Sequence, residues 1–160
     1  MINPRHLAFV QEVVNNSPYF QLLKMRVVKM EPGRAESELD YDKSGQHAFG
    51  GIHGGVYASL IDSATYWAAY CDLPEDKGAT SIDLQVNFIS MTRPGRLHAV
   101  GRVIHQGKST CLCKASVYDT KGRLLAEGTS KLLILEGKQS LKQLMENTGI
   151  AGLPPKYTDQ

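Results

Sequence analysis

One acidic side chain, Asp62, interrupts the longest apolar segment with helical periodicity in this sequence. Between Val56 and Cys71 it is the only formal charge. If that helix is covered on all sides, the carboxylate is desolvated, and burial raises the pKa of a carboxyl group. Such a carboxylate is suited to act as a general base or a nucleophile. The pattern is equally compatible with an aspartate that faces water, or with a small-residue face in a subunit contact.

The residues that precede this helix are a second candidate for chemistry. Gly50 and Gly51 are followed closely by His53-Gly54-Gly55, which leads into the helix. Glycine lets a ligand approach the backbone closely, and free N–H groups at a helix start favour negative charge, as an oxyanion site requires. An ordinary flexible turn explains His-Gly-Gly equally well.

The two features are far apart along one helix. Asp62 lies nine residues after His53, which is about two and a half helical turns. A carboxylate in the middle of a helix does not reach the carbonyl bound at the start of the same helix, unless the chain enters obliquely. A second subunit that contributes one of the two groups would also resolve the distance.

The elements that must position these groups follow from hydrophobic periodicity and turn residues. A short N-terminal helix is capped by Asn3, with Pro4 in its first turn. Residues 24–40 predict a hairpin that turns at Pro32-Gly33, followed by a loop over residues 41–52. The remaining predicted elements are a helix over residues 53–71, strands over 79–91, 97–105, 111–118 and 124–135, a short helix near 141–145, and a loose tail.

Strands grouped after one central helix predict an α+β fold with an antiparallel meander, not a parallel βαβ sheet. Residues 79–91 alternate in polarity, so that successive side chains point to opposite faces. One predicted face holds Ile82, Leu84, Val86 and Phe88, and the other holds Ser81, Asp83, Gln85 and Asn87.

The composition restricts the class of protein. The 160 residues, with a formal net charge of +2, fit a single globular domain and are too balanced in charge for a dedicated nucleic-acid binder. We find neither a signal-peptide core nor an apolar run of the roughly 20 residues that a membrane helix needs. The three cysteines lack zinc-site spacing. We therefore expect a cytoplasmic protein with reduced thiols, no metal, no cofactor and a small-molecule partner.

The segment His53-Gly54-Gly55-Val56-Tyr57-Ala58-Ser59-Leu60-Ile61-Asp62 resembles the signature of PaaI-like hotdog-fold thioesterases, in the 4-hydroxybenzoyl-CoA thioesterase superfamily. Later segments are similar too: residues 81–88, Pro94-Gly95, Gln106-Gly107-Lys108 and residues 122–128. The resemblance covers roughly residues 45–135. It implies a long central helix wrapped by a curved antiparallel sheet. We expect this hotdog domain over residues 23–136, an N-terminal helix and linker over 1–22, and a short helix and flexible tail over 137–160.

The resemblance also implies an activity, the hydrolysis of an acyl-CoA thioester to a free acid and CoA. Active sites of the family lie between the subunits of a homodimer, and many members are homotetramers. The Gly54 N–H would polarise the thioester carbonyl, and Asp62 of the partner subunit would be the nucleophile or general base. Ser81 would orient the water or the carboxylate, and His53 would shape the helix start.

Further residues are expected near the substrate. Many relatives have Asn six residues before the motif histidine, where this chain has His47; a loop shift of one residue would put Gln46 there. The predicted substrate contacts are Gln46, Gly55, Asn87, Arg93 and Lys108. Of these, Arg93 and Lys108 could meet CoA phosphates as point charges, although a solvated surface charge explains each as well.

Two other functions remain open. The replacement of the usual Asn by His47 is compatible with an acyl-CoA-binding protein that performs no catalysis on the same fold. A hotdog hydratase or dehydratase is a third possibility, but the sequence lacks a second acid–base constellation for that chemistry. Acyl-chain length does not follow from the sequence.

Overall fold

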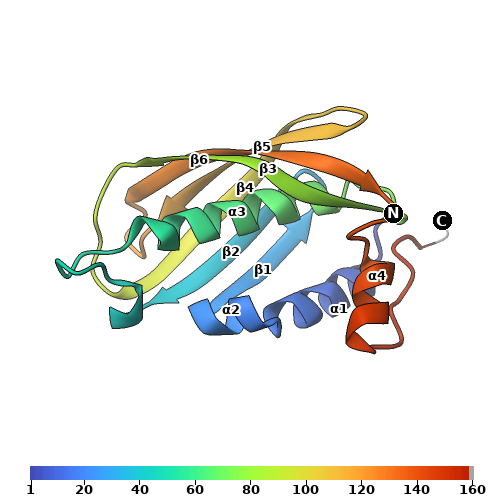
Figure 1. The fold of residues 1–160 in the computed structure, drawn as a ribbon, viewed down its shortest axis with the longest axis horizontal. Helices are drawn as coiled ribbons and strands as arrows, with labels where there is room; N and C mark the ends of the chain where they lie inside the picture. The colour runs from blue at the N-terminus through green and yellow to red at the C-terminus, as the bar shows by residue number, and fades with distance from the viewer. Residues whose placement is uncertain (159–160) are drawn as a thin grey trace.

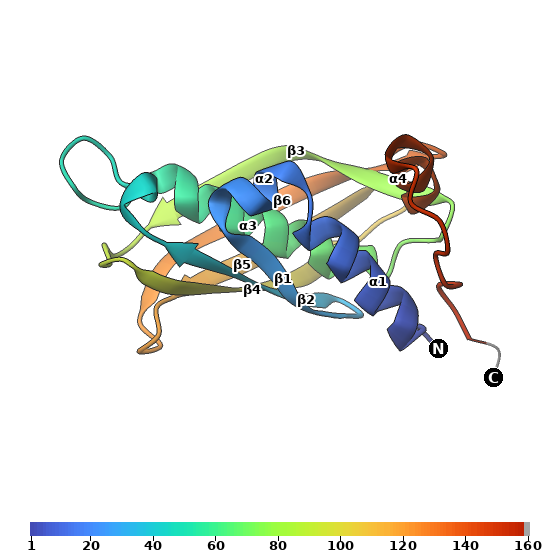
Figure 2. The same ribbon diagram turned by 90° about the horizontal axis from the view of Figure 1, so that it is seen from below.

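The computed structural model of the chain describes residues 1–158. Figures 1 and 2 show one long helix, α3, held within a curved sheet, with α1 and α2 running beside β1. The elements are α1 (Pro4–Asn15), α2 (Pro18–Leu23), β1 (Met25–Glu31), β2 (Arg34–Tyr41), a 3-10 turn (Lys43–Gly45), α3 (Gly54–Tyr70), β3 (Lys77–Phe88), β4 (Gly95–Gln106), β5 (Thr110–Tyr118), β6 (Leu124–Glu136) and α4 (Leu141–Thr148). The α+β class and the helix wrapped by an antiparallel sheet are therefore confirmed.

The order of strands in the sheet differs from the expected meander. The six strands lie in the order β1-β2-β4-β5-β6-β3, and every neighbouring pair is antiparallel. Strand β3 therefore pairs with β6 and not with β4, the next strand in the chain. The prediction of four consecutive neighbours is wrong for β3 because both edges of β4 are occupied, one by β2 and the other by β5.

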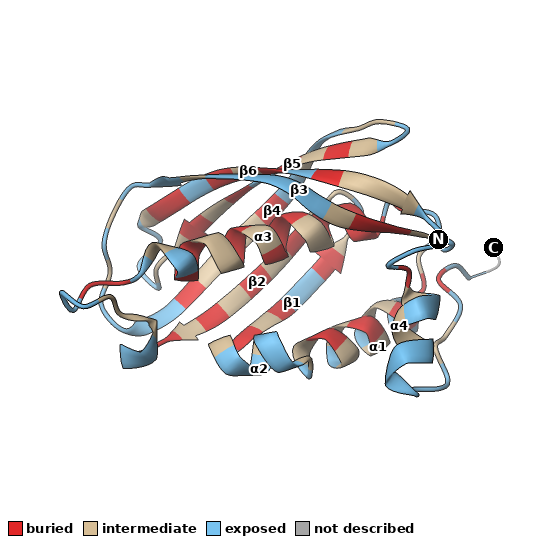
Figure 3. Cartoon of the chain, in the orientation of Figure 1, coloured by how far each residue is buried: buried red, intermediate tan, exposed pale blue. Residues whose placement is uncertain are grey.

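Helix α3 packs closely against the inner face of the sheet. Leu60, Ile61 and Ala64 are fully buried there, and Figure 3 shows buried residues along α3 and the strands that face it. At Gly101 of β4, an added Cβ atom would lie 2.0 Å from the Ala64 carbonyl oxygen. Only glycine lets the helix backbone come this near to the strand.

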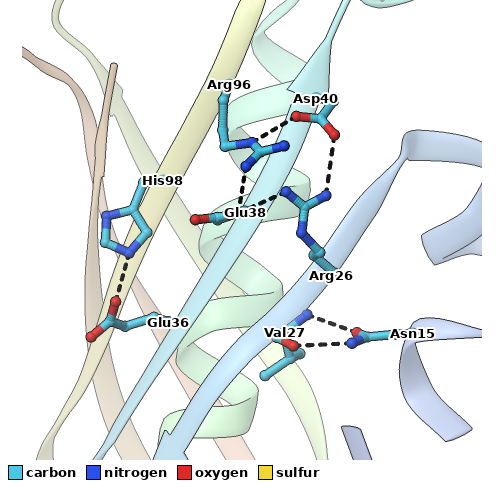
Figure 4. Close-up of polar contacts among 8 residues, drawn as sticks. All are labelled: Asn15, Arg26, Val27, Glu36, Glu38, Asp40, Arg96 and His98. Carbon is cyan, nitrogen blue, oxygen red and sulfur yellow. Dashed lines mark hydrogen bonds and ion pairs between the residues drawn. The ribbon is translucent and has the colours of Figure 1, made fainter. Parts of the chain in front are cut away.

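The two edge strands of the sheet, β1 and β3, differ in how their outer sides are covered. At the β1 edge, the Asn15 side chain accepts a hydrogen bond from the Val27 N–H (2.8 Å) and donates one to the Val27 carbonyl (3.0 Å), as Figure 4 shows. At the other edge, β3 has no neighbouring strand within residues 1–158. Its exposed residues include Ile82 and Phe88, so an apolar, unpaired edge is left open.

A network of ion pairs crosses β1, β2 and β4. Arg26 lies 2.7 Å from Glu38 and 3.1 Å from Asp40, and Arg96 lies 2.9 Å from the other oxygen of Asp40 (Figure 4). On the same strands, His98 lies 2.8 Å from a Glu36 oxygen. These contacts connect the three strands through their side chains in addition to the backbone ladder.

The C-terminal tail is attached to the end of α3. Lys156 is only 1% exposed, and its ammonium donates hydrogen bonds to the carbonyls of Tyr70 (2.9 Å) and Leu73. His6 of α1 lies 2.6 Å from the Tyr70 hydroxyl and 2.7 Å from the Pro154 carbonyl. A lysine is favourable here because the last carbonyls of a helix lack partners within the helix.

None of the helices in residues 1–158 combines the length and the apolar character needed to cross a membrane. The three cysteines are free and buried, and the sulfur atoms of Cys111 and Cys113 lie 3.5 Å apart on one side of β5. This agrees with the prediction that both point to the same face.

Candidate functional site

Asp62 lies half-buried on α3, where the Ser81 hydroxyl of β3 donates a 2.7 Å hydrogen bond to its Oδ1 atom. The pairing of β3 with β6 shifts by one residue between Ser81 and Asp83, so Ile82 forms a β-bulge. Beyond the bulge, Leu84 lines the same cavity as Asp62. The sequence prediction placed Ser81 on the face opposite to Leu84, and this is wrong because a bulge interrupts the alternation of side chains.

A cavity of about 380 Å³ opens beside Asp62 between α2, α3 and β3. Its wall includes Phe20, Tyr66 and Leu84. The Tyr19 hydroxyl of α2 lies 2.8 Å from the Ser59 hydroxyl of α3, which joins the two helices at this wall. The sequence pattern does not predict α2; the one signal for this helix is Pro18 at the first helical position after Ser17.

Tyr66, about one helical turn beyond Asp62, contributes an uncharged phenol to the cavity lining. Burial raises the pKa of Tyr66, and the nearby Asp62 charge raises that pKa further. The phenol therefore remains protonated in the neutral pH range, where its hydroxyl is able to donate a hydrogen bond.

At the start of α3, His53 acts as the N-cap. Its Nδ1 atom accepts a 2.9 Å hydrogen bond from the Gly55 N–H. The Gly54 N–H has no hydrogen-bond partner within the described residues. Of the two glycine amides, Gly54 is therefore the one available to an oxyanion.

Gly54 lies beneath the ring of Phe88. An added Cβ atom at Gly54 would be 2.7 Å from the Phe88 ring. Tyr57 and Met91 line the same small cavity, of about 270 Å³. Burial raises the pKa of Tyr57 to about 12, so Tyr57 is a neutral phenol, and it donates a 2.9 Å hydrogen bond to the Ser90 carbonyl.

A single chain does not bring Gly54 and Asp62 together. They lie eight residues apart on one helix, about 12 Å along its axis. Each lines a different cavity. The structure therefore keeps Gly54 and Asp62 of one chain apart, as their spacing in the sequence predicts.

His47 and Gln46 belong to the loop that leads into α3. The His47 N–H donates to the Gly51 carbonyl (2.9 Å), and its Nδ1 atom accepts from the Phe49 N–H (3.1 Å). Gln46 pairs with Ile52 in an isolated bridge. Both side chains are half-buried, and neither is hydrogen-bonded to Gly54 or Asp62.

The other predicted contacts are dispersed over the surface. Gly55 is exposed at the helix start, and Asn87 is exposed on β3 beside Phe88. Arg93 precedes the 12-residue strand β4 and Lys108 follows it, so the two exposed cations lie at opposite ends of that strand. Among residues 1–158, no group of three or more His, Cys, Asp or Glu side chains is arranged to hold a metal ion.

Comparison with known proteins gives similarities at the level of sequence and of fold. Residues 49–126 match the family model described as the thioesterase superfamily. The chain is 27% identical over 109 residues to acyl-coenzyme A thioesterase 13 of Homo sapiens, covering 66% of this chain and 76% of that protein. It is 26% identical over 105 residues to the 1,4-dihydroxy-2-naphthoyl-CoA hydrolase of Listeria monocytogenes, covering 66% and 85%.

A solved structure has a similar fold. The crystal structure of a thioesterase from Haemophilus influenzae superimposes with a TM-score of 0.75 at 20% identity, covering 82% of this chain and 92% of that one. At this identity the similarity concerns the fold alone.

Proposed function

We propose, from the match of residues 49–126 to the thioesterase superfamily, that the chain hydrolyses an acyl-CoA thioester to a free acid and CoA. The family similarity indicates thioester hydrolysis in general. CoA as the thiol is supported by the related hydrolases of Homo sapiens and Listeria monocytogenes, both named for CoA thioesters. The observation that carries the proposal is Asp62, a carboxylate oriented by Ser81 at the wall of a cavity.

In the proposed mechanism, the Gly54 N–H donates to the thioester carbonyl oxygen. Negative charge develops on that oxygen as the tetrahedral intermediate forms, and a preoriented N–H at a helix start stabilises it. His53 supports this role because it already holds the neighbouring Gly55 N–H. Gly54 therefore keeps one N–H free for the substrate.

Asp62 then acts in one of two ways. As a general base, it accepts a proton from water while the water oxygen bonds to the carbonyl carbon; the C–S bond breaks, and the CoA thiolate takes up a proton. As a nucleophile, a carboxylate oxygen displaces CoA thiolate, and water hydrolyses the resulting mixed anhydride. The Ser81 hydroxyl orients the carboxylate in both routes.

The proposed working unit is a homodimer joined along the open β3 edge. A two-fold axis beside β3 would place the Gly54 of one subunit near the partner's Asp62, and would cover the apolar edge. Association of two dimers would give a homotetramer. We further propose that the catalytic domain spans residues 23–136, flanked by segments 1–22 and 137–160, and that the protein acts in the cytoplasm.

The remaining predicted residues are assigned to substrate binding. His47, Gln46 and Gly55 surround the start of α3, where the carbonyl is proposed to bind. Asn87 lies on the proposed subunit edge. Arg93 and Lys108 are candidates for the CoA phosphates; because they lie at opposite ends of β4, they would serve different phosphates or different sites.

The test is release of free CoA thiol from aryl, short, medium and long acyl-CoA esters. We expect multiple turnovers with the native chain, and a turnover at least about 100-fold lower in Asp62→Asn. Folded Asp62→Asn with unchanged turnover would contradict the mechanism.

A second candidate is acyl-CoA binding without hydrolysis. The hydrogen bond that the His47 ring accepts from its own loop favours it, because that ring nitrogen is not free for a substrate carbonyl or water. Binding of CoA esters with no thiol release from any of them would establish this candidate. Loss of enoyl absorbance without thiol release would instead indicate a hydratase.

A further inference from the structure

A second cavity, of about 390 Å³, lies next to the one that contains Asp62. Phe20, Tyr66 and Trp67 line both cavities, so the same three side chains separate them. Tyr66 and Trp67 follow Asp62 on α3 by about one helical turn. The second cavity therefore adjoins the Asp62 cavity on the side toward the C-terminal end of α3.

This second cavity is formed by both ends of the chain together with α3. Val14 of α1, Tyr70 of α3 and Leu144 of α4 contribute to its wall, and Leu141 packs against the same buried cluster as Val14. Figure 1 shows α4 near the end of α3 that leads into β3. The walls thus come largely from residues outside the segment that matches the thioesterase superfamily.

The position of α4 is determined by contacts with the start of β3. At Gly78, an added Cβ atom would lie 2.1 Å from the Gln139 carbonyl oxygen, so the backbone before α4 rests on the strand. The Gln143 side chain accepts a 2.7 Å hydrogen bond from the Gln139 N–H, and Ser140 caps α4. The outer wall of the cavity therefore belongs to a flanking segment that packs against the start of β3.

The chemistry of the lining identifies which part of a CoA ester fits. The ester divides at the thioester into an acyl group and a CoA portion that carries phosphates. Within residues 1–158, the only charged residue in the lining, Lys77, is paired with Glu136 at 3.1 Å. The cavity therefore does not solvate phosphates. An acyl group bound with its carbonyl near Asp62 reaches this cavity only if it is long, because Tyr70 lies about 12 Å beyond Asp62 along the helix. An aryl ring attached directly to the carbonyl would remain in the first cavity.

We propose, on the basis of the acyl-CoA hydrolysis argued above, that the second cavity holds the distal part of a medium- or long-chain aliphatic acyl group. Phe20, Tyr66 and Trp67 then form the passage that the chain crosses, and α1 and α4 determine how long a chain is accepted. Each methylene group buried there contributes to binding of the long substrates only.

The first experiment needs no hydrolysis. Trp67 is the only tryptophan of the chain and lines both cavities, so its fluorescence reports their occupancy. We expect a saturable change in Trp67 emission when the native chain is titrated with dodecanoate below its micelle concentration, and no change with acetate. No response to dodecanoate would overturn the assignment.

The second experiment fills the cavity from two independent sides. Ser17 and Leu144 line the second cavity and not the one that contains Asp62, and Glu146 of α4 lines neither. In Ser17→Phe and Leu144→Phe, we expect kcat/KM for dodecanoyl-CoA to fall about tenfold or more, with butyryl-CoA unaffected. Glu146→Phe, the matched control, should retain the native chain-length profile, and circular dichroism confirms folding of each variant.

The outcomes separate this inference from the proposed function. If no acyl-CoA is hydrolysed but dodecanoate still changes Trp67 emission in the native chain and not in Ser17→Phe, the cavity assignment stands and the hydrolase proposal fails. If acyl-CoA esters are hydrolysed but both cavity variants lower all chain lengths equally, or none, the cavity assignment is wrong.

Discussion

The hydroxyl of Ser81 donates its hydrogen bond to Oδ1 of Asp62 across the space between β3 and α3, at 2.7 Å. Within residues 1–158 the second carboxylate oxygen, Oδ2, accepts no hydrogen bond from the protein. One oxygen is therefore held in place while the other is free to meet water or a carbonyl carbon. Ser81 faces the helix on the same side of β3 as the buried Ala79, and the bulge at Ile82 brings Leu84 onto that side as well.

Replacement of Ser81 by Ala should reduce turnover without abolishing it. A hydrogen bond to a charged group contributes about 1.5–3 kcal/mol, so we expect kcat to fall about 10- to 100-fold while the fold is retained. Ser81→Thr, which keeps a hydroxyl, should recover part of the loss. Steady-state thiol release measures both, and equal kcat values for Ala and native enzymes would exclude Ser81 from the mechanism.

Gly101 should be essential for the packing of α3 on the sheet. An added methyl group would meet the Ala64 carbonyl at 2.0 Å, where neither backbone is able to yield freely. We expect Gly101→Ala to lower the free energy of unfolding by about 1–3 kcal/mol, as overpacking does. Urea denaturation followed by circular dichroism measures this. The neighbouring exposed Arg102→Ala is the control and should cost far less.

The central helix and the first hairpin are the parts of the fold that the sequence predicts best. The apolar periodicity around Asp62 is long enough to predict α3, and its N-cap follows from the His53-Gly54 boundary. The hairpin of β1 and β2 follows from a local turn at Pro32-Gly33. Each of these features depends on residues that are close in the chain.

What the sequence does not predict depends on distant residues or very short elements. The bulge at Ile82 exists only relative to the partner strand β6, so the pattern of β3 alone does not reveal it. Helix α2 has six residues, too few to establish a helical period. The position of Lys156 at the end of α3 joins residues 86 apart, beyond any local pattern.

Lys156 should stabilise the fold through the end of α3. Lys156→Met keeps the length of the side chain but leaves the Leu73 carbonyl without its ammonium donor, and removes a cation 4.4 Å above the Tyr70 ring. We expect a loss of about 1–3 kcal/mol in the free energy of unfolding. Exposed Lys142→Met should be close to neutral. A stable Lys156→Met protein would show that the tail contributes little.

Lys156 should also make the free energy of unfolding depend on pH in the alkaline range. Burial lowers the pKa of Lys156 below its usual 10.5, so the unfolded chain binds this proton more tightly than the folded chain does. Stability contributed by Lys156 therefore rises with pH through the window between its lowered pKa and 10.5. The difference in unfolding free energy between native and Lys156→Met chains should widen over that window.

Asp40 should contribute stability that disappears in acid. The hydrogen bond from Arg96, together with that from Arg26, lowers the pKa of Asp40 against the opposing effect of burial. A lowered pKa stabilises the folded state above the ordinary value of 3.8, and the contribution is lost as pH falls through the lowered pKa. Because the side chain is 44% exposed, we expect only about 0.2–1 kcal/mol.

The measurement compares native and Asp40→Asn chains by urea denaturation at pH values from neutral down to acid. The two curves should converge as Asp40 becomes protonated. Glu12→Gln on α1 is the control, because Glu12 takes part in none of the ion pairs of the described residues. Convergence in the control as well would mean that the effect does not come from this network.

A test of the proposal that each site uses two subunits requires a variant that removes only the Gly54 N–H. Gly54→Pro achieves this, since proline is favoured at the first position of a helix. His53 already has φ −71° and ψ 135°, which a residue before proline readily adopts. Gly54→Ala keeps the N–H and meets the same Phe88 ring, which is 61% exposed and free to move, so Ala is the matched control.

We expect Gly54→Pro and Asp62→Asn to be nearly inactive separately and to complement each other when co-expressed. A mixed dimer has one site with both changes and one site with neither, because Gly54 and Asp62 of one site come from different subunits. Random pairing of equal amounts makes half of the dimers mixed, each with one of two sites intact, so about a quarter of native activity should return. If both groups acted from one chain, every site in the mixture would carry one of the two changes, and thiol release would stay at the level of the separate variants.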